Sequence, residues 1–324
     1  MTKALSLQAS TFGTAPGATP QQLRYLVGLA DSRHFGRAAE MCSVSQSTLS
    51  AGILALERQL DAAILDRSAG KHVVFTALGL ELVARSRTAL TALTAVAEAA
   101  DAARAPMSGP LRLGVIPSVG PFLLPRLMAA LRSAFPRLRL YVREDLTARL
   151  MDQLTGNRLD ILLLALPCDC GGEETVPVAR DEFLVALPEG HELAELERVP
   201  VAALAGERLL LLEDGHCLRD QALAVCGLLA GDRETQEGFA ATSLHTLVQM
   251  VAGGLGVTLL PRLAVTAGVA EGTGIALRPL AGAGAWRTLS LAWRRNAPRS
   301  VDYRALAVQV GAICAEHSLV NIRA

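Results

Sequence analysis

The fold of the N-terminal region is decided by residues 35–60, FGRAAEMCSVSQSTLSAGILALERQL. Apolar residues recur at helical spacing on both sides of a short polar turn, which predicts two helices, over 35–41 and 46–60. Ser45 is suited to begin the second helix, because its hydroxyl can accept a hydrogen bond from a first-turn amide. A helix that opens at Pro20 and a hairpin over 66–76 complete a winged helix-turn-helix.

The first turn of the second helix in such a domain meets base edges, while basic groups around it contact phosphates. Gln46 could bind adenine through its amide, and Thr48 could contact a thymine methyl group. A capping turn alone would explain a cluster of serine, threonine and glutamine, but the complete helix-turn-helix and wing favour DNA. The candidate base contacts are Ser45, Gln46, Ser47, Thr48 and Ser50. The candidate phosphate contacts are Arg33, Arg37, Arg67 and Lys71.

The predicted DNA-binding region is only weakly basic. Residues 20–75 carry six Arg and Lys against five Asp and Glu, a net charge of +1. Few phosphate contacts predict weaker binding with a shallow dependence on salt. Binding to several half-sites at once, through an oligomer, would compensate.

One long helix is predicted over residues 76–105. At the other end of the DNA-binding domain, residues 1–19 are expected to form a disordered tail. The apolar positions of the long helix include Leu78, Leu82 and Leu93, and the sequence offers no helix of similar length for it to pack on. We therefore expect this linker helix to pair with its copy in a second subunit.

Strands and helices alternate from Leu111 to the end of the chain, which is typical of an α/β domain. We expect a domain over 106–324 with two subdomains and mainly parallel sheets. Subdomain I would cover about 109–181 and 286–324, and subdomain II about 182–285. The fold class is therefore α+β and multidomain: a winged helix-turn-helix, a linker helix and an α/β effector domain.

The composition is that of a folded protein with no overall basic field, since 31 Lys and Arg balance 31 Asp and Glu. No apolar run approaches the ~20 residues that cross a membrane, and the first 20 residues do not resemble a signal peptide. We expect a cytoplasmic protein without a membrane partner, whose six cysteines begin reduced. Their spacing predicts neither a metal site nor a cofactor, and it leaves the role of Cys168 and Cys170 open.

Two thiols, Cys217 and Cys226, stand nine positions apart in a segment that reads as helix. Nine helical steps would separate their Cα atoms by ~13.5 Å and point the side chains to opposite faces. A disulfide requires Cα atoms within roughly 4.4–6.8 Å of each other. The two sulfurs can bond only if the segment refolds, which favours a redox switch over a structural crosslink.

Residues 35–40, 44–50 and 56–60 resemble the DNA-binding domain of LysR-type transcriptional regulators, and the similarity extends over about residues 20–320. That family has an effector domain of two subdomains like those of periplasmic binding proteins. Residues 215–222, with Cys226, resemble the redox segment of its peroxide-sensing members. Residues 116–121 and 241–244 resemble the same members.

This resemblance implies a DNA-binding activator of antioxidant genes and not an enzyme. Hydrogen peroxide would oxidise Cys217 to a sulfenic acid, and Cys226 would condense with it to form a disulfide. A helix N-terminus at Cys217 would favour the reactive thiolate. The implied peroxide pocket consists of Ser118, Thr147, His216 and Arg287. The implied partners are promoter DNA, further copies in a dimer or dimer of dimers, RNA polymerase, and a thiol reductant such as glutaredoxin or thioredoxin.

Other functions compete with this interpretation. A LysR-type regulator could respond to a small metabolite between its subdomains, with the cysteines incidental. A thiol peroxidase could use Cys217 and Cys226, although residues 20–105 would then have no role. Replacement of Cys217 by serine distinguishes the metabolite sensor from the peroxide sensor. It would abolish a response to peroxide but leave a response to a metabolite intact.

Overall fold

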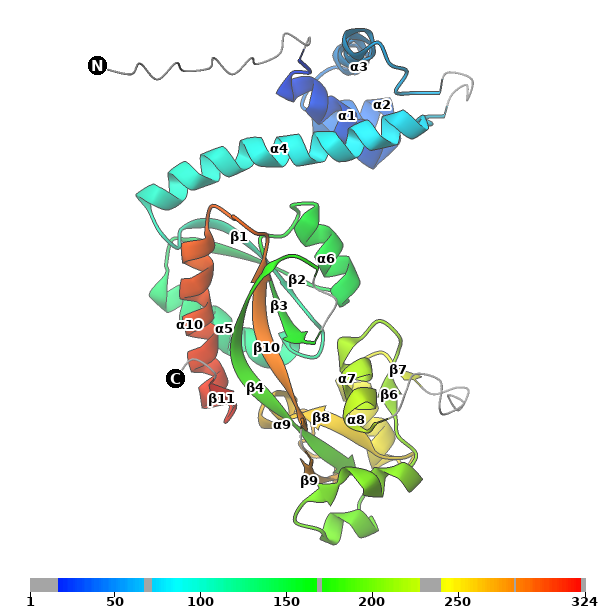
Figure 1. Ribbon diagram of the computed structural model, residues 1–324, viewed down its shortest axis with the longest axis vertical. Helices are drawn as coiled ribbons and strands as arrows, with labels where there is room; N and C mark the ends of the chain where they lie inside the picture. Colours follow the sequence, from blue (N-terminus) through cyan, green and yellow to red (C-terminus); the bar gives the residue numbers. More distant parts are fainter. Residues whose placement is uncertain (1–16, 67–71, 168–170, 228–239, 283, 322–324) are drawn as a thin grey trace, which may run out of the picture. The chain divides into compact units, whose positions relative to one another are not determined.

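The computed structural model of the chain describes residues 17–66, 72–167, 171–227, 240–282 and 284–321 (Figure 1). The chain divides into two compact units, residues 1–96 and 97–324. Within the described residues, no helix is both long enough and apolar enough to cross a bilayer. Most of the expected tail, the wing tip with Arg67 and Lys71, and Cys168 and Cys170 lie outside the described ranges.

The first unit is helical and is organised by its helix caps. Thr19 begins α1 with a reciprocal capping box to Gln22, and Ser45 accepts a hydrogen bond from Thr48 N to begin α3. Apolar faces of these helices meet in one small core that includes Leu26, Leu49 and Leu56. The helices are α1 (Pro20–Ser32), α2 (Phe35–Met41), α3 (Gln46–Leu60) and the long α4 (Ala77–Arg104).

A buried carboxylate holds the base of the wing. Oε1 of Glu57, on α3, accepts hydrogen bonds from Ile64 N and Leu65 N. Leu65 then pairs with Phe75 in an antiparallel bridge. The wing is therefore fixed to the core of the helical domain at its base.

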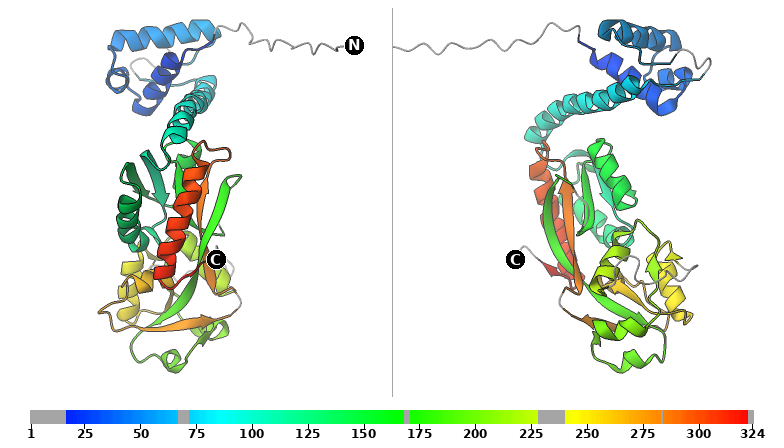
Figure 2. Two further views of the ribbon diagram at one scale, coloured as in Figure 1. Left: turned by 90° about the vertical axis from the view of Figure 1, so that its left-hand side faces the viewer. Right: turned by 45° about the vertical axis from the view of Figure 1, so that its right-hand side comes forward.

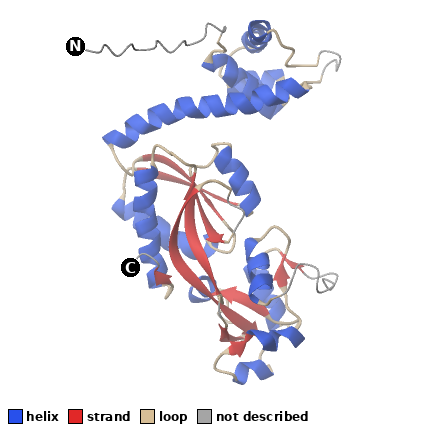
Figure 3. Ribbon diagram, viewed as in Figure 1, coloured by secondary structure: helices blue, strands red, loops and turns tan. Residues whose placement is uncertain are grey.

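The second unit is a mixed α/β domain (Figure 3). Its strands are β1 (Gly109–Val115), β2 (Leu138–Glu144), β3 (Ile161–Leu166), β4 (Glu174–Leu187), β5 (Val199–Pro200), β6 (Leu211–Leu212), β7 (Ala240–Ala241), β8 (Thr258–Pro261), β9 (Ala276–Ala281), β10 (Trp286–Trp293) and β11 (Val320–Asn321). Its helices are α5 (Gly120–Ala134), α6 (Thr147–Thr155), α7 (Cys217–Val225), α8 (Leu244–Ala252), α9 (Arg262–Thr266) and α10 (Ser300–Glu316), with short 3-10 helices η2 (Glu192–Glu195) and η3 (Val201–Gly206).

Strand β4 joins the two lobes of this domain. Its residues 174–182 pair with β10, and its residues 183–187 pair with β8 and β9. We call β1, β2, β3, α5, α6 and α10 the first lobe, and β5 to β9 with α7 and α8 the second lobe. Figure 2 shows β4 and β10 running side by side from the first lobe toward the second.

The expectation of mainly parallel sheets is wrong. Among the described residues, parallel pairing is confined to β1 with β2 and β3, β5 with β9, β6 with β7, and an isolated bridge between Leu209 and Val257. Strand β4 pairs antiparallel with β8, β9, β10 and β11, and β10 pairs antiparallel with β3. The chain leaves one lobe on β4 and returns on β10, so these connecting strands run in opposite directions.

The segment after α4 is anchored to the start of α10. Met107 N donates to Oδ1 of Asp302, and Arg299 donates to the carbonyl oxygens of Ser108 and Pro110. Arg299 and Asp302 also form a buried ion pair at 2.8 Å. The side chain of Met107 packs into the core of the domain, so backbone and side chain of this segment are both fixed.

The C-terminal cap of α10 is a buried histidine. The side chain of His317 is only 3% exposed, its Nδ1 lies 3.2 Å from Oγ1 of Thr266, and its Nε2 has no hydrogen-bond partner. Burial, with a smaller contribution from the Arg126 guanidinium, lowers the pKa of His317. The folded state therefore favours the neutral ring.

We expect this histidine to make the fold acid-sensitive. Because its folded pKa lies below the ordinary value of about 6.5, the unfolded chain binds the proton more readily. The stability from His317 is complete above pH ~6.5 and is lost as the pH falls toward the folded pKa. Thermal unfolding at pH 7.5 and 5.5 should show a smaller drop in Tm for His317→Gln than for the unmodified chain. Equal drops would contradict this assignment.

Candidate functional site

A small pocket lies where the two lobes of the second unit meet. Three short segments line it: residues 116–118 after β1, residues 146–147 at the start of α6, and residues 215–218 at the start of α7. Its empty volume is about 190 Å³, including the solvent at its mouth. The pocket therefore suits a very small ligand.

The thiol of Cys217 faces a hydroxyl across this pocket. Sγ of Cys217 lies 2.7 Å from Oγ1 of Thr147, and each residue is the first residue of its helix. Helix N-termini carry partial positive charge from unpaired backbone amides. Two of them therefore meet at one sulfur–oxygen pair.

His216 is the residue that immediately precedes α7. Its backbone is extended, and its side chain does not cap the helix. Burial lowers the pKa of His216, although the nearby Glu213 carboxylate opposes the shift. The imidazole is therefore neutral near pH 7. It can donate a hydrogen bond into the pocket, but it does not supply a fixed positive charge.

Arg287 approaches the pocket from behind Ser118. Its Nη1 donates to Ser118 Oγ at 2.6 Å, and its Nη2 donates to Ser118 O at 3.0 Å. A guanidinium has only donors, so Ser118 Oγ must accept here and retains its own proton to donate elsewhere. Arg287 is not among the residues that line the pocket. The structure thus brings Ser118, Thr147, His216 and Cys217 together and places Arg287 behind them.

The partner of Arg287 is Asp181, which the sequence did not identify as a site residue. Both side chains are fully buried and their nearest charged atoms are 2.9 Å apart. Burial raises the pKa of Asp181, while Arg287 opposes this shift. Asp181 faces Arg287 directly across the β4–β10 pair and accepts a hydrogen bond from Leu263 N. Asp181 is a charged residue at a buried position of an apolar strand, and this pattern could have marked it as a functional residue. The sequence alone did not show that its partner is Arg287.

The second thiol stands at the other end of α7. Cys226 is the C-terminal cap of that helix and is half-buried against the core. The helix is regular between the two cysteines, so their Cα atoms are ~13.5 Å apart by helical rise. Neither thiol is in a disulfide. The geometric premise of a refolding switch therefore holds in this structure.

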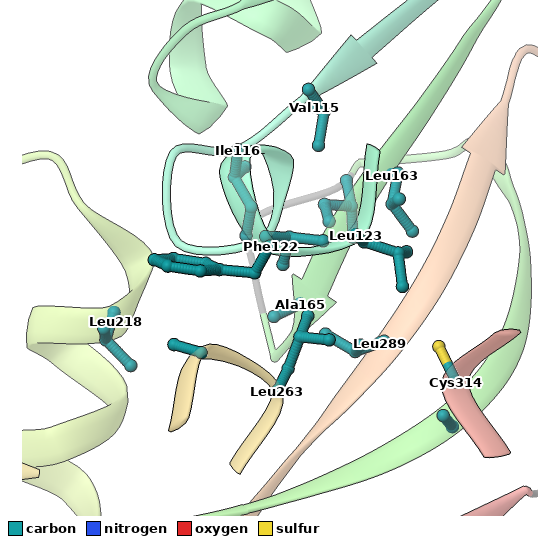
Figure 4. Close-up of a cluster of buried hydrophobic side chains, with 14 of the residues drawn as sticks. Val115, Ile116, Phe122, Leu123, Leu163, Ala165, Leu218, Leu263, Leu289 and Cys314 are labelled. Carbon is teal, nitrogen blue, oxygen red and sulfur yellow. The ribbon is translucent and has the colours of Figure 1, made fainter. Parts of the chain in front are cut away.

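Helix α7 is docked against the first lobe by its inward face. Leu218 and Ala222 are buried, and Gln221 Nε2 donates to Ala165 O on β3 at 3.1 Å. Figure 4 shows Leu218 projecting from α7 toward the apolar cluster that contains Phe122 and Leu263.

The other described cysteines are poorly suited to react with a small oxidant. Cys314 is completely buried, and burial together with the charge of Asp181 raises its pKa to about 12. Burial also raises the pKa of Cys42, with Arg24 opposing. Since the thiolate is the reactive form, both residues are unfavourable nucleophiles.

The candidate base contacts of the DNA-binding domain lie exposed at the start of α3. Ser45 Oγ accepts from Thr48 N at 3.1 Å and also bonds to the hydroxyls of Ser47 and Thr48. Gln46 and Ser50 are exposed. This network orders the polar surface of the first turn and leaves the Gln46 amide the longest exposed side chain there.

The basic candidates have local partners as well. The Arg33 guanidinium stacks on the Phe75 ring at 4.9 Å, and Arg37 Nη2 donates to Ser32 O. Both side chains belong to exposed residues. Arg67 and Lys71 lie outside the described residues.

Helix α4 presents apolar side chains to solvent within the described chain. Leu78, Leu80, Leu93 and Val96 are 46%, 50%, 48% and 71% exposed. Leu78, Leu93 and Val96 share one face of the helix by their spacing, and an exposed apolar face of this kind indicates a surface that another element covers.

Comparisons with known proteins agree with this architecture. Residues 20–80 match the family described as bacterial regulatory helix-turn-helix protein, lysR family, and residues 104–313 match the LysR substrate binding domain. The DNA-binding transcriptional dual regulator OxyR of Escherichia coli K12 is 44% identical over 90% of this chain and 94% of its own length. The hydrogen peroxide-inducible genes activator of Haemophilus influenzae is 40% identical over 90% and 95%.

Solved structures give the same result. Full-length OxyR of Pseudomonas aeruginosa, as a cysteine-to-aspartate variant, covers 91% of this chain and 95% of its own at 35% identity and a TM-score of 0.74. A hydrogen peroxide-bound cysteine-to-serine variant of OxyR from Corynebacterium glutamicum covers 93% and 94% at 30% identity and a TM-score of 0.65. The helix-turn-helix unit, the two-lobed effector domain and these relatives together establish that the chain belongs to the LysR family of bacterial transcriptional regulators.

Proposed function

We propose that this LysR-family regulator senses hydrogen peroxide through Cys217 and activates antioxidant genes. The observation that carries the proposal is the Cys217 thiol, held 2.7 Å from Thr147 Oγ1 in a small pocket between two helix N-termini. Its relatives named hydrogen peroxide-inducible genes activators support the same signal. The pocket volume favours peroxide over a larger metabolite.

The first chemical step is attack by the Cys217 thiolate on one peroxide oxygen. The sulfur electron pair forms an S–O bond while the O–O bond breaks, so the sulfur is oxidised and the peroxide is reduced. The products are a sulfenic acid and hydroxide. The Ser118 hydroxyl, fixed as a donor by Arg287, and the neutral His216 can donate hydrogen bonds to the departing oxygen.

The second step joins the two ends of α7. The thiolate of Cys226 attacks the sulfenic sulfur, hydroxide leaves, and a proton converts it to water. Because helix α7 keeps the cysteines apart, its inward face must leave the first lobe before this bond forms. Removing Leu218 from its buried position costs about 1.5–3 kcal/mol. Formation of the disulfide therefore changes the contact between the lobes.

The output of this change is a different geometry of the oligomer on promoter DNA. The exposed apolar side chains of α4 support pairing with a second copy, and a dimer of such dimers would contact several half-sites. The proposed contacts to DNA are those of the first turn of α3 together with Arg33, Arg37, Arg67 and Lys71. The altered oligomer would act on RNA polymerase at the promoter. A cytoplasmic dithiol reductant, glutaredoxin or thioredoxin, would reduce the disulfide and restore both thiols.

We expect Cys217→Ser to abolish the peroxide response, because it removes the attacking sulfur. Cys226→Ser should still form the sulfenic acid but no intramolecular disulfide. Thiol-labelling mass spectrometry before and after substoichiometric peroxide, with DNA footprinting on the same samples, measures both. Cys314→Ser is the matched control and should respond normally. Preferential oxidation of Cys42 or Cys314 in the unmodified chain would contradict the assignment.

Loss of a pocket hydroxyl should slow the first step without preventing it. Ser118→Ala and Thr147→Val each remove one hydrogen-bonding group at the reacting atoms, and each should reduce the second-order rate with peroxide by about a hundredfold. Rapid mixing with peroxide in a Cys226→Ser background isolates this step. Thr155→Val, at the exposed end of α6, serves as the control. An unchanged rate in both pocket variants would exclude the pocket as the peroxide site.

The weak positive charge of the DNA-binding domain predicts shallow salt dependence. The slope of log K against log salt should be smaller in magnitude than the roughly −10 of a strongly basic repressor. Arg37→Ala should reduce the magnitude by about 1 for each DNA-binding domain engaged. Gln46→Ala should instead reduce discrimination between operator and unrelated DNA. A slope as steep as that of strongly basic repressors would overturn the prediction.

A further inference from the structure

Side-chain hydrogen bonds attach α7 to the first lobe at two successive turns. Cys217 contacts Thr147 Oγ1 in the first turn, and Gln221 donates to Ala165 O in the next. Residues four apart lie on the same face of a helix, so both bonds point toward the first lobe. The first of them involves the sulfur that peroxide modifies. The second is untouched by that chemistry.

The Gln221 amide is only half satisfied in the docked helix. The side chain is 5% exposed, and a carbonyl oxygen can only accept, so the group that contacts Ala165 O must be the NH₂. The Oε1 of the same amide is buried without a hydrogen-bond partner. An unsatisfied buried acceptor weakens the state that contains it, because water would satisfy it after release. The amide therefore holds α7 through one bond while limiting how firmly the helix is held.

From this geometry we infer that Gln221 is a positioning residue that holds α7 docked and sets the rate at which sulfenic Cys217 is converted to the disulfide. This inference rests on the proposed function, in which the two thiols must meet. Oxidation of Cys217 changes the first-turn contact with Thr147. The hydrogen bond from Gln221 and the burial of Leu218 and Ala222 then remain to delay the approach of Cys226.

Gln221 thereby separates two properties of the sensor. The rate of sulfenic acid formation depends on the pocket, which Gln221 does not line. The lifetime of the sulfenic acid depends on how long α7 stays docked. A long lifetime exposes the oxidised sulfur to other cellular thiols, and a short one commits it to the intramolecular bond. The side chain at position 221 would therefore determine whether the sulfenic acid reacts with other thiols or forms the 217–226 disulfide.

The test uses the reduced full-length chain and one equivalent of hydrogen peroxide, quenched at intervals. Dimedone trapping and intact mass give the sulfenic acid, and blocking of the remaining thiols gives the 217–226 disulfide. Gln221→Glu has the same shape but no donor, so it should speed the second step at least roughly fivefold, the effect of losing one ordinary hydrogen bond. The first step should be unchanged. Lowering the pH protonates the introduced carboxyl, restores a donor and should return the second rate toward that of the parent chain at the same pH.

Ala224→Glu is the matched control, since it adds the same charge on the exposed side of the same helix. Gln221→Ala is the second variant if the glutamate prevents folding, and it should also speed the second step although alanine is the better helix former. Parent-like second rates in folded Gln221 variants, or equal acceleration by Ala224→Glu, would overturn the inference. Failure of the parent chain to form the 217–226 disulfide would instead overturn the proposed function itself.

Discussion

The buried ion pair between Asp181 and Arg287 is the interaction on which the second unit depends most. It lies on the two strands that connect the lobes, and it reaches Ser118 on one side and the start of α9 on the other. Removing either partner of such a pair leaves an uncompensated buried charge, at a cost of about 3–5 kcal/mol. The pair therefore fixes the pocket wall to the part of the sheet that both lobes share.

In the proposed mechanism this wall stays in place while the opposite side of the pocket changes. The Ser118 loop and α6 belong to the first lobe and are supported by buried strands. Cys217 begins a nine-residue helix, with His216 just before it, and this helix is held by a small apolar face and a few hydrogen bonds. Short helices have little stability without tertiary contacts. In the proposed mechanism, oxidation of Cys217 would therefore alter α7 while the remainder of the domain keeps its packing.

Much of this architecture follows from sequence, and the reasons are local. Pro20 and the Ser45 hydroxyl marked helix starts, so α1 and α3 begin as expected, and α2 and α3 end where the apolar spacing predicted. The family comparisons confirm the predicted fold class. The antiparallel pairing of β4 and β10 could not be predicted, since it joins segments more than 100 residues apart whose own patterns resemble strands of either kind. For the same reason the sequence did not show that Asp181 is the partner of Arg287. Gln221 was recognised only as one residue of the redox motif, with no role of its own.

The attachment of the linker segment to α10 has a consequence for the integrity of the chain. Asp302 bonds to Met107, 195 positions earlier, and Arg299 holds the two carbonyl groups that follow. The segment between α4 and β1 therefore acquires these hydrogen bonds only after α10 has folded. During synthesis, residues 20–96 would emerge long before residues 107–110 acquire these hydrogen bonds. A protein shortened before α10 would lack the hydrogen bonds that fix residues 107–110 to the second unit.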